Sequence, residues 1–290
     1  MKEGAMKLRG LFVGTITIDI QYLVERFPLS NEKMFATKCG LAVGGPATNA
    51  AITFSYLGGN SHLLTTIGQH PFTSFMESEL SHYNIEVTDL AVGVSQLPTV
   101  SSIVTTCRSG DRAVITTASS PPSIMSEMTF ITNQDDYNVV LVDGFNMEIC
   151  CTVAMQARQL GIPVVLDAGS WKKGMERLLP YVDIAICSEQ FHTPDGGDAE
   201  SVMAYLADQG IGYRVITRGE RPILYDTSKD TGEIAIEAVE VVDTLGAGDV
   251  LHGAFCYYYA KDHQFVPALF YASQVATLSC QTFGTRSWMG

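Results

Sequence analysis

The sequence has little positive charge and no long uninterrupted run of apolar residues. Of its 290 residues, 18 are Lys or Arg and 31 are Asp or Glu, which gives a formal net charge of −13. This balance argues against a general nucleic-acid binder and against binding to anionic membrane, because both surfaces attract clustered basic side chains. No apolar stretch is long enough for a signal peptide or a membrane span, so we expect a cytoplasmic protein.

Several common site motifs are also missing. The seven cysteines form no Cys-x-x-Cys pair and have no zinc-site spacing with histidine, and we expect most of them to be buried, reduced thiols. No Gly-x-x-x-x-Gly-Lys-[Ser/Thr] string occurs, which disfavours a P-loop nucleotide site. The first strand-like run is followed by the single Gly14 and not by Gly-x-Gly-x-x-Gly, which disfavours a dinucleotide-binding opening.

The hydrophobic pattern, in contrast, is rich. With 46% hydrophobic residues, the chain can bury a sizeable core. Short runs rich in Val, Ile and Leu alternate with segments of helical length, a pattern that predicts an α/β fold with a doubly wound, mainly parallel sheet. The expected strands lie at 11–13, 63–67, 139–142, 164–166, 184–186 and 215–217, and the clearest expected helices at 72–83, 147–160 and 199–209.

Two segments break this alternation, at about 27–44 and 95–117. The first is polar with turn signals, and the second reads as a hairpin around a turn at Ser109-Gly110-Asp111. We expect residues 1–290 to form a single domain in which these two segments contribute a small second β-sheet.

The most informative stretch is Asp243-Thr244-Leu245-Gly246-Ala247-Gly248-Asp249. Strand-like alternation runs into it from 233 to 242, and an apolar helical pattern follows it. The first amides of a helix have no partner within the helix and carry the positive end of its dipole, so this turn suits an anion. A carboxylate beside bound phosphate suits the removal of a proton from an attacking hydroxyl. A short glycine pattern taken alone is equally compatible with a purely structural turn.

The complete string resembles the C-terminal signature of the ribokinase-like, or PfkB, carbohydrate kinases. The resemblance implies that Gly246, Ala247 and Gly248 form an anion hole and that Asp249 is the catalytic base. It also implies a ribokinase-like fold whose second sheet is a lid over the sugar and a possible homodimer contact, with ATP and Mg²⁺ as cofactors. Gly44, Gly45 and Asn49 resemble the family's N-terminal signature.

Further site residues follow from position within this resemblance. We expect Asp19, just beyond the first strand, and Asp143, at the end of 139–142, to contact the sugar, although both residues are also typical of loops and helix caps. Glu189 resembles a magnesium-shell residue, but the family's preceding Asn is not evident, and Pro222 replaces the last glycine of the family's nucleotide stretch. The expected nucleotide-site residues are Thr217, Gly219, Thr244, Gln274 and Gly284.

These residues together predict an ATP-dependent kinase that phosphorylates a hydroxyl, most simply a hydroxymethyl group, of a small carbohydrate. The Val-x-His-Gly-Ala sequence after Asp249 resembles that of ketose kinases in the family. Lys33 either binds an anionic substituent of the substrate or is an ordinary solvated lysine. A nucleoside kinase of the same fold and a non-catalytic sugar-binding relative remain open alternatives.

Overall fold

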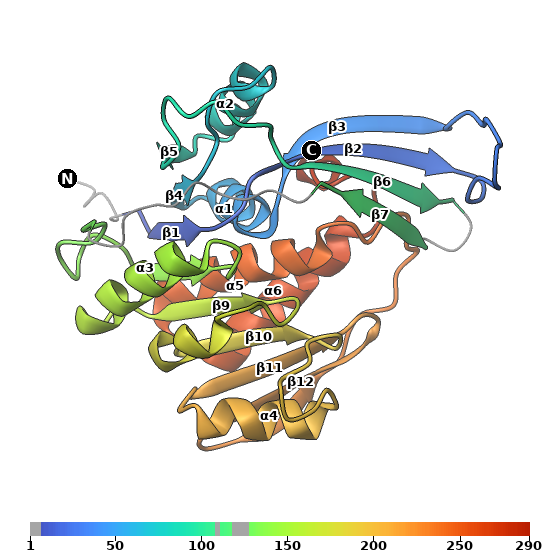
Figure 1. Ribbon diagram of the computed structural model, residues 1–290. Coiled ribbons are helices and arrows are strands. Elements are labelled where there is room, and N and C mark those ends of the chain that lie inside the picture. Colours follow the sequence, from blue (N-terminus) through green and yellow to red (C-terminus); the bar gives the residue numbers. More distant parts are fainter. Residues whose placement is uncertain (1–6, 108–110, 118–127) are drawn as a thin grey trace, which may run out of the picture.

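The larger of two sheets forms the centre of the protein (Figure 1). The computed structural model describes residues 7–107, 111–117 and 128–290. Nine strands run in the order β13-β12-β11-β10-β9-β8-β1-β4-β5, and all neighbours are parallel except at β12 and β13. The strands are β1 (Arg9–Val13), β4 (Asn60–Thr65), β5 (Glu86–Asp89), β8 (Val139–Val142), β9 (Val164–Ala168), β10 (Ile184–Ser188), β11 (Tyr213–Arg218), β12 (Arg221–Thr227) and β13 (Thr231–Ile234).

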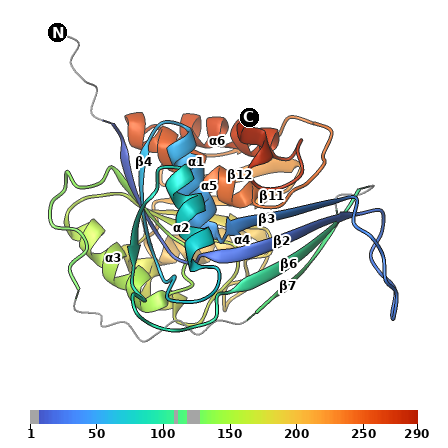
Figure 2. The same ribbon diagram turned by 90° about the horizontal axis from the view of Figure 1, so that it is seen from above.

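Helices cover both faces of this sheet, which confirms the doubly wound α/β prediction. Residues that alternate along a strand enter two separate cores: Phe12 packs in the core with α1, α5 and α6, whereas Leu11 and Val13 pack in the core with α3 and α4. Figure 2 shows α3 on the opposite side of the sheet from α1 and α6. The helices are α1 (Pro46–Tyr56), α2 (Thr73–His82), α3 (Met147–Gln159), α4 (Ala199–Asp208), α5 (Ala247–Asp262) and α6 (Phe265–Ser279), with short 3₁₀ turns η1 (Met175–Arg177), η2 (Leu179–Tyr181) and η3 (Ser287–Met289).

The smaller sheet projects from one end of the larger one, as Figure 1 shows. We call it the lid; its order is β3-β2-β6-β7, from β2 (Thr17–Val24), β3 (Lys38–Gly44), β6 (Val100–Thr106) and β7 (Arg112–Thr116). A lid was expected, but its long strand β2 lies outside both expected segments. The alternating residues that follow the first strand pair with β3 and β6 instead of continuing as a loop. Ser109 and Gly110 of the expected turn lie outside the described residues.

The segment before α5 differs from its prediction. Strand β13 ends at Ile234, and residues 235–246 form no strand, so the expected strand over 233–242 is wrong beyond that point. The physical reason is position: β13 is the edge strand of the nine-stranded sheet, and the chain must leave that edge to reach the start of α5. The amides of Val242 and Asp243 donate to the Cys280 carbonyl at 2.8 and 3.2 Å, and these contacts take the place of a strand ladder.

All seven cysteines are free thiols, but only Cys150, Cys187 and Cys256 are buried. The expectation that most would be buried is therefore wrong. Within the described part of the chain, no helix is long and apolar enough to cross a membrane.

Helices α1 and α5 cross at very short range. A Cβ atom added at Gly253 would lie 2.3 Å from the carbonyl oxygen of Ala50 and 2.8 Å from the Cβ of Thr53. Only a residue without a side chain permits this approach, which brings the N-terminal turn of α5 next to Asn49 of α1.

We therefore expect Gly253→Ala to destabilise the protein by about 1–3 kcal/mol, because the methyl group forces backbone apart in a packed core. Urea unfolding followed by circular dichroism measures this change. Gly212→Ala is the matched control, since its added Cβ would meet nothing closer than 3.9 Å. Equal stability of the two variants would contradict the close-packing argument.

Candidate active site

The N-terminus of α5 presents unpaired backbone donors. Gly246 caps the helix in the left-handed conformation, with φ of 72°, and its carbonyl accepts the Val250 amide at 2.8 Å. The Ala247 amide reaches the Thr244 carbonyl at 3.3 Å, whereas the amides of Gly248 and Asp249 have no hydrogen-bond partner among the described residues. Gly248 is exposed, and a Cβ atom added to it would meet nothing within 4 Å, so this turn is open to solvent. The arrangement suits an anion.

Asp243 holds this turn in place. Its Oδ1 accepts the Leu245 amide at 3.0 Å and its Oδ2 accepts the Gly284 amide at 3.0 Å. The carboxylate therefore ties the loop before α5 to the C-terminal segment, and its side chain is buried. Within the motif, Asp243 shapes the anion site and Asp249 is left to face it.

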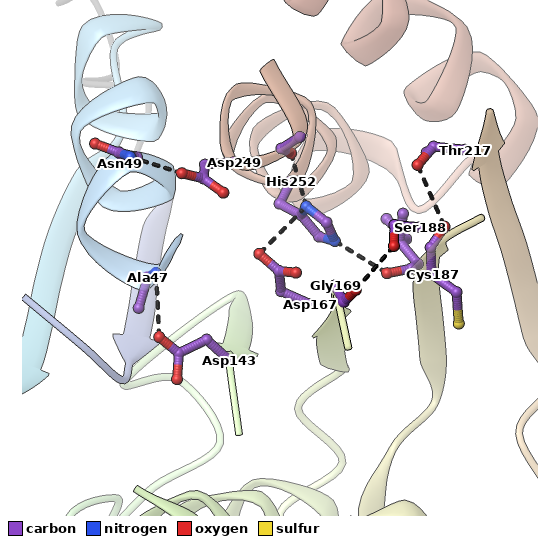
Figure 3. Close-up of polar contacts among 12 residues, drawn as sticks. Ala47, Asn49, Asp143, Asp167, Gly169, Cys187, Ser188, Thr217, Asp249 and His252 are labelled. Atoms are coloured by element: carbon purple, nitrogen blue, oxygen red, sulfur yellow. Dashed lines mark hydrogen bonds and ion pairs between the residues drawn. The ribbon is translucent and has the colours of Figure 1, made fainter. Parts of the chain in front are cut away.

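Asp249, on the first turn of α5, lies across from α1. Its Oδ2 accepts a hydrogen bond of 2.6 Å from Nδ2 of Asn49, and Figure 3 shows the two side chains pointing toward one another. Burial, reinforced by the carboxylate of Asp167, raises the pKa of Asp249 to about 7, although the Asn49 hydrogen bond and His252 act in the opposite direction. A carboxyl with this pKa can accept and release a proton near neutral pH, as a general base must.

His252, one helical turn after Asp249, is enclosed. Its Nδ1 lies 2.7 Å from the Gly248 carbonyl and 3.5 Å from Oδ2 of Asp167, and its Nε2 lies 3.2 Å from the Ile186 carbonyl (Figure 3). Both ring nitrogens therefore face acceptors inside the protein. His252 supports the start of α5 against β9 and β10, and the geometry does not make it a second base.

The lid and α1 contribute the other side of the site. Asp19, expected just beyond the first strand at the carboxyl end of the sheet, lies within lid strand β2, which follows that strand; its Oδ1 accepts the Thr17 hydroxyl at 2.7 Å. Burial raises the pKa of Asp19. A Cβ on Gly44 would fall 1.9 Å from its Oδ2, so glycine is required there. Gly45 has φ of 99° and caps α1, so both glycines bring backbone close to Asp19 and Asn49.

Asp143 lies differently from what its position at a strand end suggested. Its side chain is fully buried, Oδ2 accepts the Thr15 amide at 2.8 Å, and Oδ1 accepts the Phe145 amide at 3.0 Å. Burial raises its pKa to about 6, although these two hydrogen bonds act in the opposite direction. Oδ2 also reaches the Ala47 amide at 3.4 Å (Figure 3), so the carboxylate joins three backbone segments. This geometry favours a positioning role for Asp143.

The expected nucleotide-site residues are spread over four segments. Thr217 ends β11 with its hydroxyl 3.3 Å from the Cys187 carbonyl, and Gly219 has φ of 64° in the turn between β11 and β12. The Thr244 carbonyl accepts Nη1 of Arg112, from lid strand β7, at 2.8 Å. Gln274 is half-buried on α6, and Gly284 has φ of 86° and donates to Asp243. The structure joins Thr244 and Gly284 through the loop before α5.

Glu189 forms an ion pair with Arg221 at the surface, and its role in a magnesium shell stays a prediction. Among the described residues, no group of three or more His, Cys, Asp and Glu side chains is arranged to hold a metal. The residues present therefore do not form a protein cage for Mg²⁺. Pro222, the departure noted in the sequence, lies in β12, where its carbonyl accepts Nε of Arg218 at 2.8 Å.

Three charged side chains near the site were missed by the sequence analysis: Glu79, Arg112 and Arg286. Arg286 donates to Oδ1 of Asn49 at 2.8 Å although 237 positions separate the two residues. Glu79 accepts the Val43 amide at 2.9 Å. No local motif identifies Glu79 or Arg112 as site residues. For Arg286 the only hint in the sequence is that this basic residue comes two positions after Gly284, in a short C-terminal segment.

Comparison with known proteins identifies the family. The model of the pfkB family carbohydrate kinases matches residues 9–289, so the chain belongs to that family. The family defines the protein as a phosphotransferase of the ribokinase-like fold.

Individual relatives are distant in sequence, but the similarity extends over nearly the whole of each chain. A ribokinase from Haemophilus influenzae is 23% identical over 288 residues, which cover 95% of this chain and 93% of the relative. A candidate ribokinase from Agrobacterium tumefaciens has a crystal structure with a TM-score of 0.84 at 24% identity, covering 98% of this chain and 94% of that one. Arabidopsis thaliana ribokinase, solved with ribose and ATP, has a TM-score of 0.73 at 20% identity, covering 96% and 94%. At these identities the solved structures establish the fold.

The pKa of Asp249 predicts the pH dependence of turnover. Below about pH 7 the carboxyl is protonated and cannot accept the hydroxyl proton, so kcat/KM should fall about tenfold for each further pH unit. Initial rates of ADP formation across the neutral range measure this limb, and enzyme preincubated at each pH and assayed at one pH controls for inactivation. A limb centred near pH 4, the range of an ordinary carboxyl, would contradict the assignment.

Proposed function

We propose that this protein transfers the γ-phosphoryl group of ATP to a hydroxyl, most simply a hydroxymethyl group, of a small sugar. The observation that carries the proposal is the position of Asp249. Its carboxylate, with a pKa of about 7, stands one residue from the open, unpaired amide of Gly248 and is held by Asn49. A proton acceptor and an anion site thus lie side by side on the first turn of α5.

The chemistry follows from this pairing. Asp249 accepts the proton of the acceptor hydroxyl while that oxygen forms a bond to the γ-phosphorus and the bond from the γ-phosphorus to the bridging β,γ-oxygen breaks. The amides of Gly248 and Asp249 stabilise the charge on the transferring phosphoryl group. The proton then leaves Asp249 for solvent, and ADP and the sugar phosphate depart. Mg²⁺ would reach the site with the ATP phosphates and neutralise part of their charge, since no cluster of three or more His, Cys, Asp or Glu side chains is arranged to hold a metal among the described residues.

The acceptor is proposed to bind between the lid and α1. Asp19, Asn49 and the backbone at Gly44 and Gly45 offer acceptors and donors suited to sugar hydroxyls. Names of relatives point to pentoses, since they include ribokinases and a deoxyribokinase, and the sequence after Asp249 points to ketoses. The lid residue Lys33 lies 5.9 Å from the Phe35 ring in the exposed loop between β2 and β3 and does not support recognition of an anionic substituent. We place the reaction in the cytoplasm, where ATP is available and thiols stay reduced.

The test is ADP formation from ATP over a panel of ribose, deoxyribose, ketoses, sugar phosphates and adenosine. We expect at least one neutral sugar to be turned over, and Asp249→Ala to reduce kcat by at least about 100-fold because the general base is lost. Asp262→Ala, at the far end of α5, is the control for removing a carboxylate.

Other outcomes separate the alternatives. Turnover restricted to adenosine would identify a nucleoside kinase. A rise in melting temperature with a sugar, without turnover by the wild type, would identify a non-catalytic binder.

We further propose a homodimer through the outer face of the lid. Cross-strand partners share a face of a sheet, so Ile20, Leu41, Ser102 and Ile115 form a row on the face opposite Asp19. Leu41 is 49% exposed and Ile115 is 76% exposed. Leu41 and Ile115, the exposed apolar side chains of this row, suit burial against a second copy.

Light scattering coupled to size-exclusion chromatography should therefore give the mass of a dimer for the wild type and a monomer for Ile115→Lys. The charged side chain would be buried without a partner in the dimer. Val92→Lys is the matched control, because Val92 is 79% exposed and lies outside the lid. A monomeric wild type would overturn this proposal.

A further inference from the structure

Arg286 brings a positive charge from the C-terminal segment into the centre of the site. Only 13% of its side chain is exposed. Its Nη2 donates both to the Val43 carbonyl and to Oδ1 of Asn49, each at 2.8 Å, and its Nη1 donates to the Thr285 carbonyl at 3.2 Å. A planar guanidinium can hold several acceptors at once, which a lysine cannot do in the same geometry.

Carboxylates surround this cation. Nε of Arg286 lies 3.8 Å from Oε1 of Glu79, and Asp19 and Asp249 act on it through space. The ring of Tyr83 lies 5.7 Å from the guanidinium carbon. Burial lowers the pKa of Arg286, while these acidic groups oppose the shift and favour its charged form.

The arginine determines which way the Asn49 amide points. Arginine has donors and no acceptor, so only the carbonyl oxygen of Asn49 can face Nη2. The amide nitrogen is then directed to Asp249, which it reaches at 2.6 Å. If Asn49 were free to turn over, its oxygen would face the carboxylate and the hydrogen bond would be lost.

Arg286 also holds the base of the lid. The Val43 carbonyl accepts from Arg286, and the Val43 amide donates to Oε2 of Glu79 at 2.9 Å. Both backbone groups of this residue are thereby fixed immediately before Gly44 and Gly45. The same side chain thus contacts the lid strand and the residue that orients the base.

We propose that Arg286 is a positioning residue for phosphotransfer: it fixes the Asn49 amide and the base of lid strand β3, so that Asp249 stays ionised and in place next to the acceptor. The inference rests on the proposed function for its role in turnover. Its effect on Asp249 is a property of the protein without substrate, and the two can be tested separately.

The first test measures the titration of the Asp249 carboxyl by ¹³C NMR of protein labelled at its aspartates. The Asp249→Asn variant assigns the Asp249 signal. Removing Arg286 removes a nearby cation and frees Asn49, and both changes favour the protonated carboxyl. We expect the midpoint of Asp249 in Arg286→Met to rise by about one pH unit, and in Arg286→Lys by less. The groups that face Asp249 in all variants are Asn49 from α1, Asp167 from β9, His252 from α5 and Asp19 from β2.

The matched control is Arg214→Met. Arg214 is equally enclosed, with 8% of its side chain exposed, and it pairs with Asp226 at 2.7 Å at the start of β11, away from α5. This variant should lower the melting temperature without moving the Asp249 titration. An unmoved midpoint in Arg286→Met, or the same shift in Arg214→Met, would overturn the proposal.

The second test uses turnover of the sugar identified by the panel. We expect Arg286→Lys to lower kcat by about 10-fold and to shift the acidic limb of kcat/KM to higher pH, as Asn49→Ala should do. Because both residues act on Asp249 through one chain of hydrogen bonds, the double variant should lose less than the product of the two single losses.

If the losses in kcat of the two single variants multiply in the double variant, and the acidic limb of kcat/KM does not move, then Arg286 is merely structural. If Arg286→Met fails to fold, Arg286→Lys carries both tests. Absence of wild-type turnover would count against the proposed function alone, since the NMR titration still decides the role of Arg286.

Discussion

The site depends on the close approach of α1 and α5. Gly253 lets the two helices pack with backbone almost in contact, and this packing brings Asn49 within 2.6 Å of Asp249 across 200 positions of sequence. Everything else at the site is arranged around that contact: the unpaired amides of Gly248 and Asp249 lie on the same turn as the Asp249 carboxylate, and the lid attaches directly before α1. A hydrogen bond of this kind is sensitive to small shifts, which is why two supporting groups, Asp243 and Arg286, hold the surrounding loops.

Three aspartates show how environment divides one side-chain type among different tasks. Asp143 is fully buried with both oxygens occupied by backbone amides, so it joins segments. Asp243 is buried and clamps the turn before α5 to the C-terminal segment. Asp249 has one side-chain partner, a pKa near neutrality and open space beside it, which is the combination that general-base chemistry requires.

The C-terminal segment adds contacts among the loop before α5, helix α1 and the lid. Gly284 donates to Asp243, and Arg286 donates to Asn49 and to the Val43 carbonyl. Thr285 packs so close to Gly246 that a Cβ atom added there would lie 2.9 Å from Cγ2 of Thr285. On the other side of the site, Arg112 of the lid reaches the Thr244 carbonyl. The turn before α5 is therefore in contact with the lid by two routes. This connection offers a physical path by which the position of the lid and the geometry of Asp249, the proposed base, affect one another.

The sequence by itself determined the fold class, the family and the residues of the two glycine motifs. Those features are local: Gly45 and Gly246 adopt backbone conformations that glycine alone tolerates well, and the alternation of strands and helices is visible in short windows. Tertiary structure decided that β2 joins the lid, that Asp143 serves backbone amides, and that Arg286 belongs to the site. A hydrophobic pattern reports burial but not which sheet a strand joins. The role of a charged side chain is set by partners that can lie more than 200 positions away, and no local pattern encodes them.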